Sequence, residues 1–177
     1  MQVPDWQVAW TEYGPTVWRT VYRLLGHHAD ALDCYQETFF AAWQFAQRNH
    51  VEDWAAFLTK IATRRAIDRL RQRIRSQQRF APLHEAPEPA TSADCPVQHA
   101  RDAELMALVR EGLAELPEKQ AEVFWLSCIE GLSHQQISAH MQVPPGEVRV
   151  LLHRARVGLA TMLESTLLDE RENDRDR

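Results

Sequence analysis

Cysteine and long apolar runs are scarce in this 177-residue chain. The three cysteines, Cys34, Cys95 and Cys128, are widely spaced and form no CxxC or Cys/His pair, which supports neither a disulfide framework nor a zinc site. No stretch approaches the roughly 20 apolar residues of a membrane-spanning helix. The first ten residues also lack the basic segment and apolar run of a secretion signal. We therefore expect a cytoplasmic protein without membrane insertion, metal or cofactor.

Strand signals are equally scarce. Only six glycines punctuate the chain, and no run of period-two alternation persists, whereas apolar residues recur at helical spacing. Four prolines interrupt the helical pattern in residues 80–98. The sequence predicts an all-α protein with two small helical domains joined by a proline-rich linker. The expected bounds are 1–79 for the first domain, 80–98 for the flexible linker, 99–165 for the second domain and 166–177 for an acidic tail.

Helical periodicity in the first domain predicts a three-helix bundle. The first helix ends at Gly26, the second covers about 29–47, and the third begins near Asp53. The expected core residues are Trp6, Trp10, Val17, Val21 and Leu24 from the first helix, Leu32, Tyr35, Phe39, Phe40 and Trp43 from the second, and Trp54, Phe57, Leu58, Ile61, Ile67, Leu70 and Ile74 from the third.

The third helix runs into RRAIDRLRQRIRSQQR, residues 64–79, which holds seven arginines in a chain of net charge -5. On a helix these cations and a preceding lysine should form two stripes side by side. The first stripe is Lys60, Arg64, Arg71 and Arg75, and the second is Arg65, Arg69 and Arg73. Most charge runs are solvated faces of mixed sign, but here Asp68 is the only acid available to the arginines. The segment therefore predicts contact with nucleic acid.

Two further polar features lie nearby. Arg48, Asn49 and His50 precede the third helix, and their side chains suit single-stranded or opened DNA, although an ordinary interhelical loop is the alternative. Asp30, Asp33 and Glu37 are spaced three and four residues apart on one helix face. Such a face is either merely solvated or oriented toward a basic protein partner.

In the second domain, helices are expected at about 98–115, 118–130, 134–141 and 145–165. Ser133 and Gln136 form a capping box, and Pro145 suits the first position of the last helix. This pattern predicts a helix-turn-helix with its turn at 141–144. The last helix should bury Val148, Leu152, Ala155 and Leu159 and expose Glu147, Arg149, Val150, His153 and Arg154. The exposed face suits the DNA major groove, and a helical hairpin with a basic surface is the alternative.

Taken together, these segments resemble the extracytoplasmic-function class of bacterial RNA polymerase sigma factors, within the sigma-70 family. DALDCYQETFFAAW is similar to the family's segment that docks on the clamp helices of the largest polymerase subunit. FLTKIATRRAIDRLR is similar to its minus-ten reading helix. The stretch from LPEKQAEVFWL to LHRAR resembles its minus-thirty-five reading domain. The resemblance covers roughly residues 10–79 and 100–163.

The resemblance implies roles for individual residues. The expected contacts with core polymerase are Asp30, Asp33, Gln36 and Glu37. The expected contacts with the minus-ten element are Arg48, Asn49, His50, Lys60, Arg64, Arg65, Asp68, Arg69 and Arg71. The expected contacts with the minus-thirty-five element are Glu147, Arg149, Val150, His153, Arg154 and Arg156. A flexible linker would let the two domains reach separated promoter elements.

The implied function is a sigma factor that binds the clamp and flap of core RNA polymerase, directs it to promoters and assists DNA opening, without catalysis of its own. A stand-alone helix-turn-helix regulator is the alternative, and the usual enzyme motifs are missing. The sequence does not decide whether an anti-sigma protein binds the chain. Gln142 stands where the family usually has a turn glycine, which would cost about 1 kcal/mol if that position is left-handed.

Overall fold

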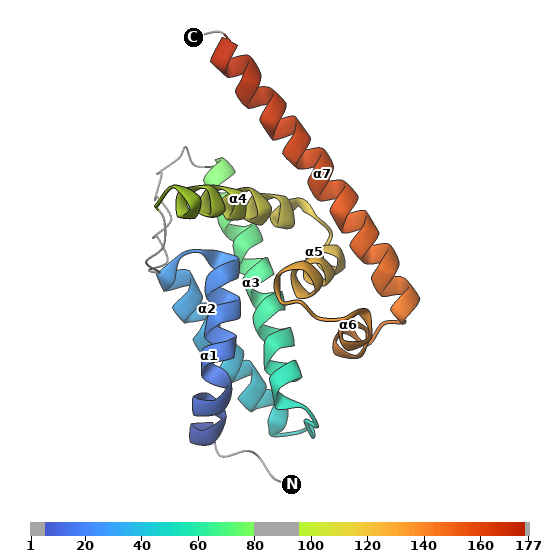
Figure 1. Ribbon diagram of the computed structural model, residues 1–177. Helices are drawn as coiled ribbons and strands as arrows, with labels where there is room; N and C mark the ends of the chain where they lie inside the picture. The colour runs from blue at the N-terminus through green and yellow to red at the C-terminus, as the bar shows by residue number, and fades with distance from the viewer. Residues whose placement is uncertain (1–5, 80–95, 176–177) are drawn as a thin grey trace. The chain divides into compact units, whose positions relative to one another are not determined.

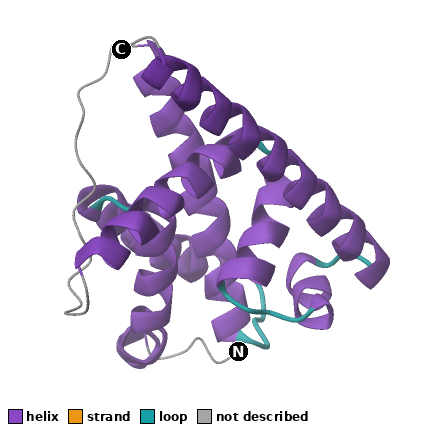
Figure 2. Cartoon of the chain, turned by 45° about the horizontal axis from the view of Figure 1, so that its top comes forward, coloured by secondary structure: helices purple, strands orange, loops and turns teal. Residues whose placement is uncertain are grey.

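The computed structural model describes residues 6–79 and 96–175, and every regular element among them is helical (Figures 1 and 2). The chain divides into two compact units. The first contains α1–α3, and the second contains α4, α5, η1, α7 and the start of α6. The predicted all-α class with two helical domains is confirmed. Residues 80–95 of the predicted linker lie outside the described residues, and 96–98 belong to α4.

In the first unit, α1 (Trp6–Leu25), α2 (His28–Ala46) and α3 (Trp54–Arg79) pack against one another. Gly26 ends α1 as predicted, with a φ of 62° and its amide donating to the Tyr22 carbonyl at 2.8 Å. His27 then caps α2, because its Nδ1 accepts a hydrogen bond from the Asp30 amide at 3.3 Å. Asp53 caps α3 in the same way, accepting from the Ala56 amide at 2.9 Å.

The core of the first unit differs from the prediction on α2. Tyr35 and Phe39 are buried as expected, but Leu32, Phe40 and Trp43 are 40%, 59% and 43% exposed. The core-facing stripe of α2 consists of Ala31, Cys34, Tyr35, Thr38, Phe39, Ala42 and Ala46. Each of the three exposed residues directly follows a core-facing residue, and a helix turns by about 100° at each residue, so these side chains point away from the core. On α1, Trp10 is likewise 45% exposed, against the prediction.

The second unit contains α4 (Pro96–Glu115), α5 (Glu118–Phe124), α7 (Pro145–Arg175) and the start of α6 (His134–Met141). The helix predicted over 118–130 changes at Trp125 into a π-helical turn, η1 (Trp125–Ile129). The consecutive side chains Trp125 and Leu126 are both fully buried there. Instead of a separate tail from residue 166, α7 continues to Arg175, through a segment rich in leucine, glutamate and arginine, which are good helix formers.

Candidate functional site

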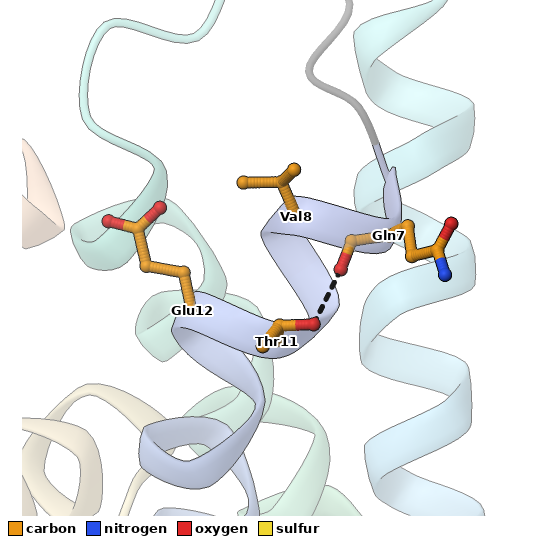
Figure 3. Close-up of a pocket in the computed structure, with 4 residues that line it drawn as sticks. All are labelled: Gln7, Val8, Thr11 and Glu12. Atoms are coloured by element: carbon orange, nitrogen blue, oxygen red, sulfur yellow. Dashed lines mark hydrogen bonds between the residues drawn. The ribbon is translucent and has the colours of Figure 1, made fainter.

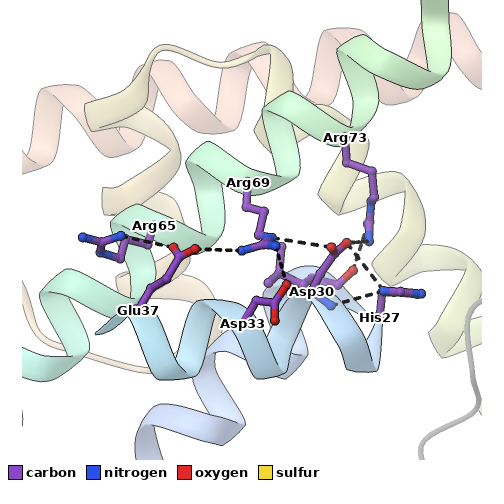
Figure 4. A network of polar contacts seen from close by, with 8 residues as sticks. His27, Asp30, Asp33, Glu37, Arg65, Arg69 and Arg73 are labelled. Carbon is purple, nitrogen blue, oxygen red and sulfur yellow. Dashed lines mark hydrogen bonds and ion pairs between the residues drawn. The ribbon is translucent and has the colours of Figure 1, made fainter. Parts of the chain in front are cut away.

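Arg69 of α3 lies at the centre of a set of ion pairs that join α2 to α3 (Figure 4). Its Nη2 is 2.8 Å from Asp33 Oδ2, and its Nη1 is 3.3 Å from Glu37 Oε1. Its Nε is 3.5 Å from Asp30 Oδ1. Arg65 Nη1 lies 3.2 Å from Glu37 Oε2, and Arg73 Nη1 lies 3.2 Å from Asp30 Oδ2. These contacts define the α2–α3 ladder, which consists of Asp30, Asp33, Glu37, Arg65, Arg69 and Arg73.

One end of the ladder also reaches α1. Arg73 Nη2 donates to the Leu25 carbonyl oxygen at 2.8 Å, at the last turn of α1. His27 Nδ1 lies 3.6 Å from Asp30 Oδ2. Arg73 therefore holds the C-terminal end of α1 and the N-terminal end of α2 at the same point of α3. Sequence reasoning did not single out the structural roles of Arg73 and His27, since the partners of Arg73 are more than 40 residues away in the chain.

The ladder corrects the charge argument made from the sequence. Asp68 is not the only acid available to the arginines, because Arg65, Arg69 and Arg73 pair with carboxylates of α2. The two arginine stripes are also not side by side, because Arg69 is five residues from Arg64 and lies about 140° away around the helix. Asp68 itself lies 3.7 Å from Arg71, one turn further along α3.

The predicted DNA-reading loop lies between α2 and α3. Arg48, Asn49 and His50 are exposed there. The Phe45 carbonyl oxygen accepts hydrogen bonds from the amides of Arg48 at 3.1 Å and Asn49 at 3.0 Å, and from Asn49 Nδ2 at 3.0 Å. These bonds satisfy the Phe45 carbonyl near the end of α2 and anchor the turn, while the Arg48 and His50 side chains are exposed. Lys60 and Arg64 lie on α3 outside the ladder, and Arg64 is exposed.

The helix-turn-helix has the predicted local geometry. Ser133 Oγ accepts from the Gln136 amide at 3.3 Å, while Gln136 Oε1 accepts from the Ser133 amide at 2.9 Å, which completes the capping box. In the turn, Gln142 has a φ of 58°, so the left-handed conformation expected from the family's glycine is present. The Ser138 hydroxyl closes the turn by donating to the Val143 carbonyl at 2.6 Å.

On α7, the buried side is the one predicted, and the exposed side differs from the prediction at Glu147, which is half-buried. Val148, Leu152, Ala155 and Leu159 are at most 4% exposed. The exposed residues are Arg149, Val150, His153, Arg154 and Arg156. Two predicted contacts also have protein partners. Glu147 Oε1 lies 3.4 Å from Lys119 Nζ of α5, and Arg156 Nη2 lies 3.7 Å from Cys128 Sγ of η1.

A surface hollow lies on α1, away from the residues described above. Figure 3 shows a surface hollow lined by Gln7, Val8, Thr11 and Glu12, all from α1, in which the Thr11 hydroxyl donates to the Gln7 carbonyl at 2.8 Å. Within residues 6–79 and 96–175, no group of three or more His, Cys, Asp or Glu side chains is arranged to hold a metal ion. No helix in that part of the chain is long and apolar enough to cross a membrane.

The fold and exposed faces define a two-domain helical protein with a helix-turn-helix in its second domain. Family comparison identifies residues 9–76 as "Sigma-70 region 2" and residues 106–159 as "Sigma-70, region 4". The chain therefore belongs to the sigma-70 family, among the extracytoplasmic-function (ECF) RNA polymerase sigma factors. This confirms the family resemblance of the sequence.

Individual relatives agree with this assignment. The chain is 32% identical over 161 residues to the ECF RNA polymerase sigma factor SigE of Mycolicibacterium smegmatis, covering 91% of this chain and 62% of SigE. It is 26% identical to SigW of Bacillus subtilis, covering 85% of this chain and 84% of SigW. The fold is similar to the sigma factor RpoE of Bartonella quintana, solved with the anti-sigma factor NepR, with a TM-score of 0.57, 22% identity, and coverage of 92% of this chain and 98% of RpoE.

Proposed function

We propose that this chain is a sigma factor that binds core RNA polymerase, directs it to specific promoters and assists DNA opening. The observation that carries the proposal is the presence, in one chain, of a sigma-70 region 2 domain and a sigma-70 region 4 domain, each with an exposed face suited to its partner. A stand-alone helix-turn-helix regulator would need only the second of these domains. We assign no catalytic step to the chain itself, and we place its activity in the bacterial cytoplasm, where transcription occurs.

The proposed polymerase-docking face lies on α2. Asp30, Asp33, Gln36 and Glu37 form its polar side, of which Asp33 and Glu37 are 57% and 51% exposed. Beside them the exposed apolar side chains Leu32, Phe40 and Trp43 share a stripe, and the rings of Phe40 and Trp43 stack with centroids 5.9 Å apart. An apolar centre with a charged rim is the composition of a protein interface. We propose that the clamp of the largest polymerase subunit covers this stripe.

Two other faces are proposed to contact promoter DNA. At the minus-ten element, Arg48, Asn49 and His50 would bind an opened base, while Lys60 and Arg64 would contact the backbone beside it. The Arg71 side chain is only 11% exposed, so the predicted DNA contact of Arg71 is replaced by its pairing with Asp68, 3.7 Å away.

At the minus-thirty-five element, α7 would enter the major groove. Arg149 and Arg154 suit guanine or phosphate, and the exposed Val150 suits a thymine methyl group. His153 and Arg156 would extend the same contact along the groove, and Glu147 would hold Lys119 of α5 toward the backbone. The polymerase flap is proposed as the protein partner of this domain.

An anti-sigma partner is also proposed. RpoE of Bartonella quintana, which shares the fold, is solved in complex with the anti-sigma factor NepR. A protein inhibitor would suit the exposed apolar stripe of α2, because covering it would block docking on polymerase.

Transcription in vitro tests the proposal. Purified core RNA polymerase is incubated with sheared bacterial genomic DNA, with and without this chain, and transcript 5′ ends are sequenced. We expect a set of start sites that appears only when the chain is present, each preceded by two shared sequence elements. The matched control is Arg149→Ala with Arg154→Ala, which should lose these starts while still binding core enzyme. Identical start sites with and without the wild-type chain would refute the proposal.

A further inference from the structure

We infer that Arg69 is a positioning residue for the polymerase-docking face and makes no contact with promoter DNA. This inference rests on the proposed function and refines it, because Arg69 is among the residues that the family resemblance places at the minus-ten element. The structure shows the Arg69 guanidinium directed at the carboxylates of α2 instead (Figure 4).

The geometry of the guanidinium supports this role. Each of its three nitrogens faces a different carboxylate: Nε faces Asp30, Nη2 faces Asp33 and Nη1 faces Glu37. These three acids span two turns of α2, about 10 Å at 1.5 Å per residue. A planar fork with several fixed donors can bridge such a row, whereas the single ammonium of a lysine cannot. The arrangement therefore depends on arginine in particular.

The contacts leave one oxygen free to meet a partner. Both oxygens of Asp30 and both oxygens of Glu37 face cationic groups of the same unit. Asp33 uses Oδ2 for Arg69, and its Oδ1 has no partner among the described residues. Asp33 is also the most exposed of the three carboxylates, at 57%. The ladder thus fixes the Asp33 carboxylate with one oxygen held inward and the other available to solvent.

Pre-ordering of this kind favours binding more than it favours folding. The formal charges of the three acids and the three arginines cancel, so the ladder has little net electrostatic attraction for a charged partner. Ion pairs this exposed also stabilise a fold only slightly. Side chains that are already ordered lose less conformational freedom when a partner binds. The partner group that fits is a cationic side chain of the polymerase that reaches the free Oδ1 of Asp33.

The direction of Arg69 also separates it from the DNA-facing side of α3. Arg69 lies about 140° around the helix from Arg64, as the five-residue separation requires. The exposed Arg75 lies close to the direction of Arg64, about 20° away after eleven residues. Arg75 has no ion pair among the described residues and serves as the matched control.

The test compares Arg69→Gln with Arg75→Gln in the full-length chain. Affinity for core RNA polymerase is measured by fluorescence anisotropy. Promoter opening is measured by permanganate reactivity at saturating core enzyme, on a fragment selected from random-sequence DNA by the wild-type holoenzyme. We expect Arg69→Gln to weaken core binding about tenfold and to leave opening at saturation unchanged. Arg75→Gln should leave core binding unchanged and reduce promoter opening.

A double-mutant cycle shows whether Arg69 acts through Asp33. Asp33→Asn alone should weaken core binding, and adding Arg69→Gln to it should cost much less than Arg69→Gln costs in the wild-type chain. Arg69→Lys keeps the charge but not the fork, and it should also weaken core binding. If Arg69→Gln melts early in circular dichroism, Arg69→Lys decides the question in a folded chain.

Two results would overturn the inference. One is an unchanged core affinity in both Arg69→Gln and Arg69→Lys. The other is a loss of promoter opening at saturating core enzyme that matches the loss in Arg75→Gln. Failure of the proposed function gives a different result, because the wild-type chain itself would then show no binding to core enzyme.

Discussion

Arg73 of α3 donates a hydrogen bond to the carbonyl oxygen of Leu25 at 2.8 Å, across 48 residues of sequence. The same guanidinium lies 3.2 Å from Asp30, next to the cap of α2. The first bond satisfies a carbonyl of the last turn of α1, which has no partner within the helix. One side chain thereby links all three helices of the region 2 domain.

We therefore expect Arg73→Ala to destabilise the region 2 domain. The substitution removes a charge-assisted hydrogen bond to a part-buried carbonyl and an ion pair, so the free energy of unfolding should fall by about 1–2 kcal/mol. Urea unfolding followed by circular dichroism measures the change. Arg75→Ala is the control and should stay within about 0.5 kcal/mol of the wild-type value. Equal stability of the two variants would show that the Leu25 contact contributes nothing.

The contrast between Arg73 and Ser133 shows what could be predicted from the sequence. Ser133 and Gln136 are three residues apart, so their reciprocal hydrogen bonds follow from local spacing and were predicted. Arg73 meets partners more than 40 residues away, and only the packing of three helices brings them together. The ladder cannot be predicted for the same reason, because its acids and its arginines lie on separate helices and only the packing of α2 against α3 pairs them.

Apolar periodicity alone also fails to separate the core residues of α2 from its exposed apolar residues. It correctly gave Tyr35 and Phe39 to the core, but it also assigned Phe40 and Trp43, which are 59% and 43% exposed. A helix in a three-helix bundle buries one stripe, and a residue that is apolar for docking looks the same in sequence as one that is apolar for folding. The excess of large apolar residues on α2 was itself the available signal for a protein interface.

Gln142 offers a prediction about the helix-turn-helix. Its φ of 58° places a side chain in the left-handed region, which costs a non-glycine residue about 1 kcal/mol. Gln142→Gly should therefore raise the stability of the second domain by about 0.5–1 kcal/mol, measured by thermal unfolding. The control is Ala139→Gly, at an exposed position in the interior of α6, which should lower stability by about 1 kcal/mol. A destabilised Gln142→Gly variant would contradict the account of the turn.

Cys34 should be an inert thiol. Burial raises its pKa from the usual 9.0 to about 12, and the nearby Glu37 carboxylate acts in the same direction. At pH 8 the native protein should react with iodoacetamide at the exposed Cys128 and not at Cys34, as mass spectrometry of peptides can show. Labelling of Cys34 should appear only in urea. Rapid labelling of Cys34 in the folded protein would disprove its burial.

The same shift predicts a pH dependence of stability. The folded state favours the protonated Cys34 thiol more strongly than the unfolded state does. This preference makes its full contribution to the free energy of unfolding below about pH 9, and the contribution is lost as the pH rises toward 12. Cys34→Ala should therefore flatten the stability profile between pH 9 and 12. Cys128→Ala, its control, should leave the slope of the profile unchanged.

The exposed basic face of α7 yields the last prediction. Arg149 and Arg154 are both exposed, and the buried Val148 and Leu152 beside them fix the orientation of the helix. If both arginines contact DNA, Arg149→Ala with Arg154→Ala should weaken holoenzyme binding to a selected promoter fragment about tenfold or more. The slope of log affinity against log salt should become shallower by about 1–2, since fewer counterions are released from the duplex. Arg19→Ala, in an exposed position on α1, controls for the loss of surface charge and should change neither quantity. A weaker affinity with an unchanged salt slope would point instead to a disturbed helix-turn-helix, because a folding defect removes binding-competent molecules without altering the charge that each one brings to the DNA.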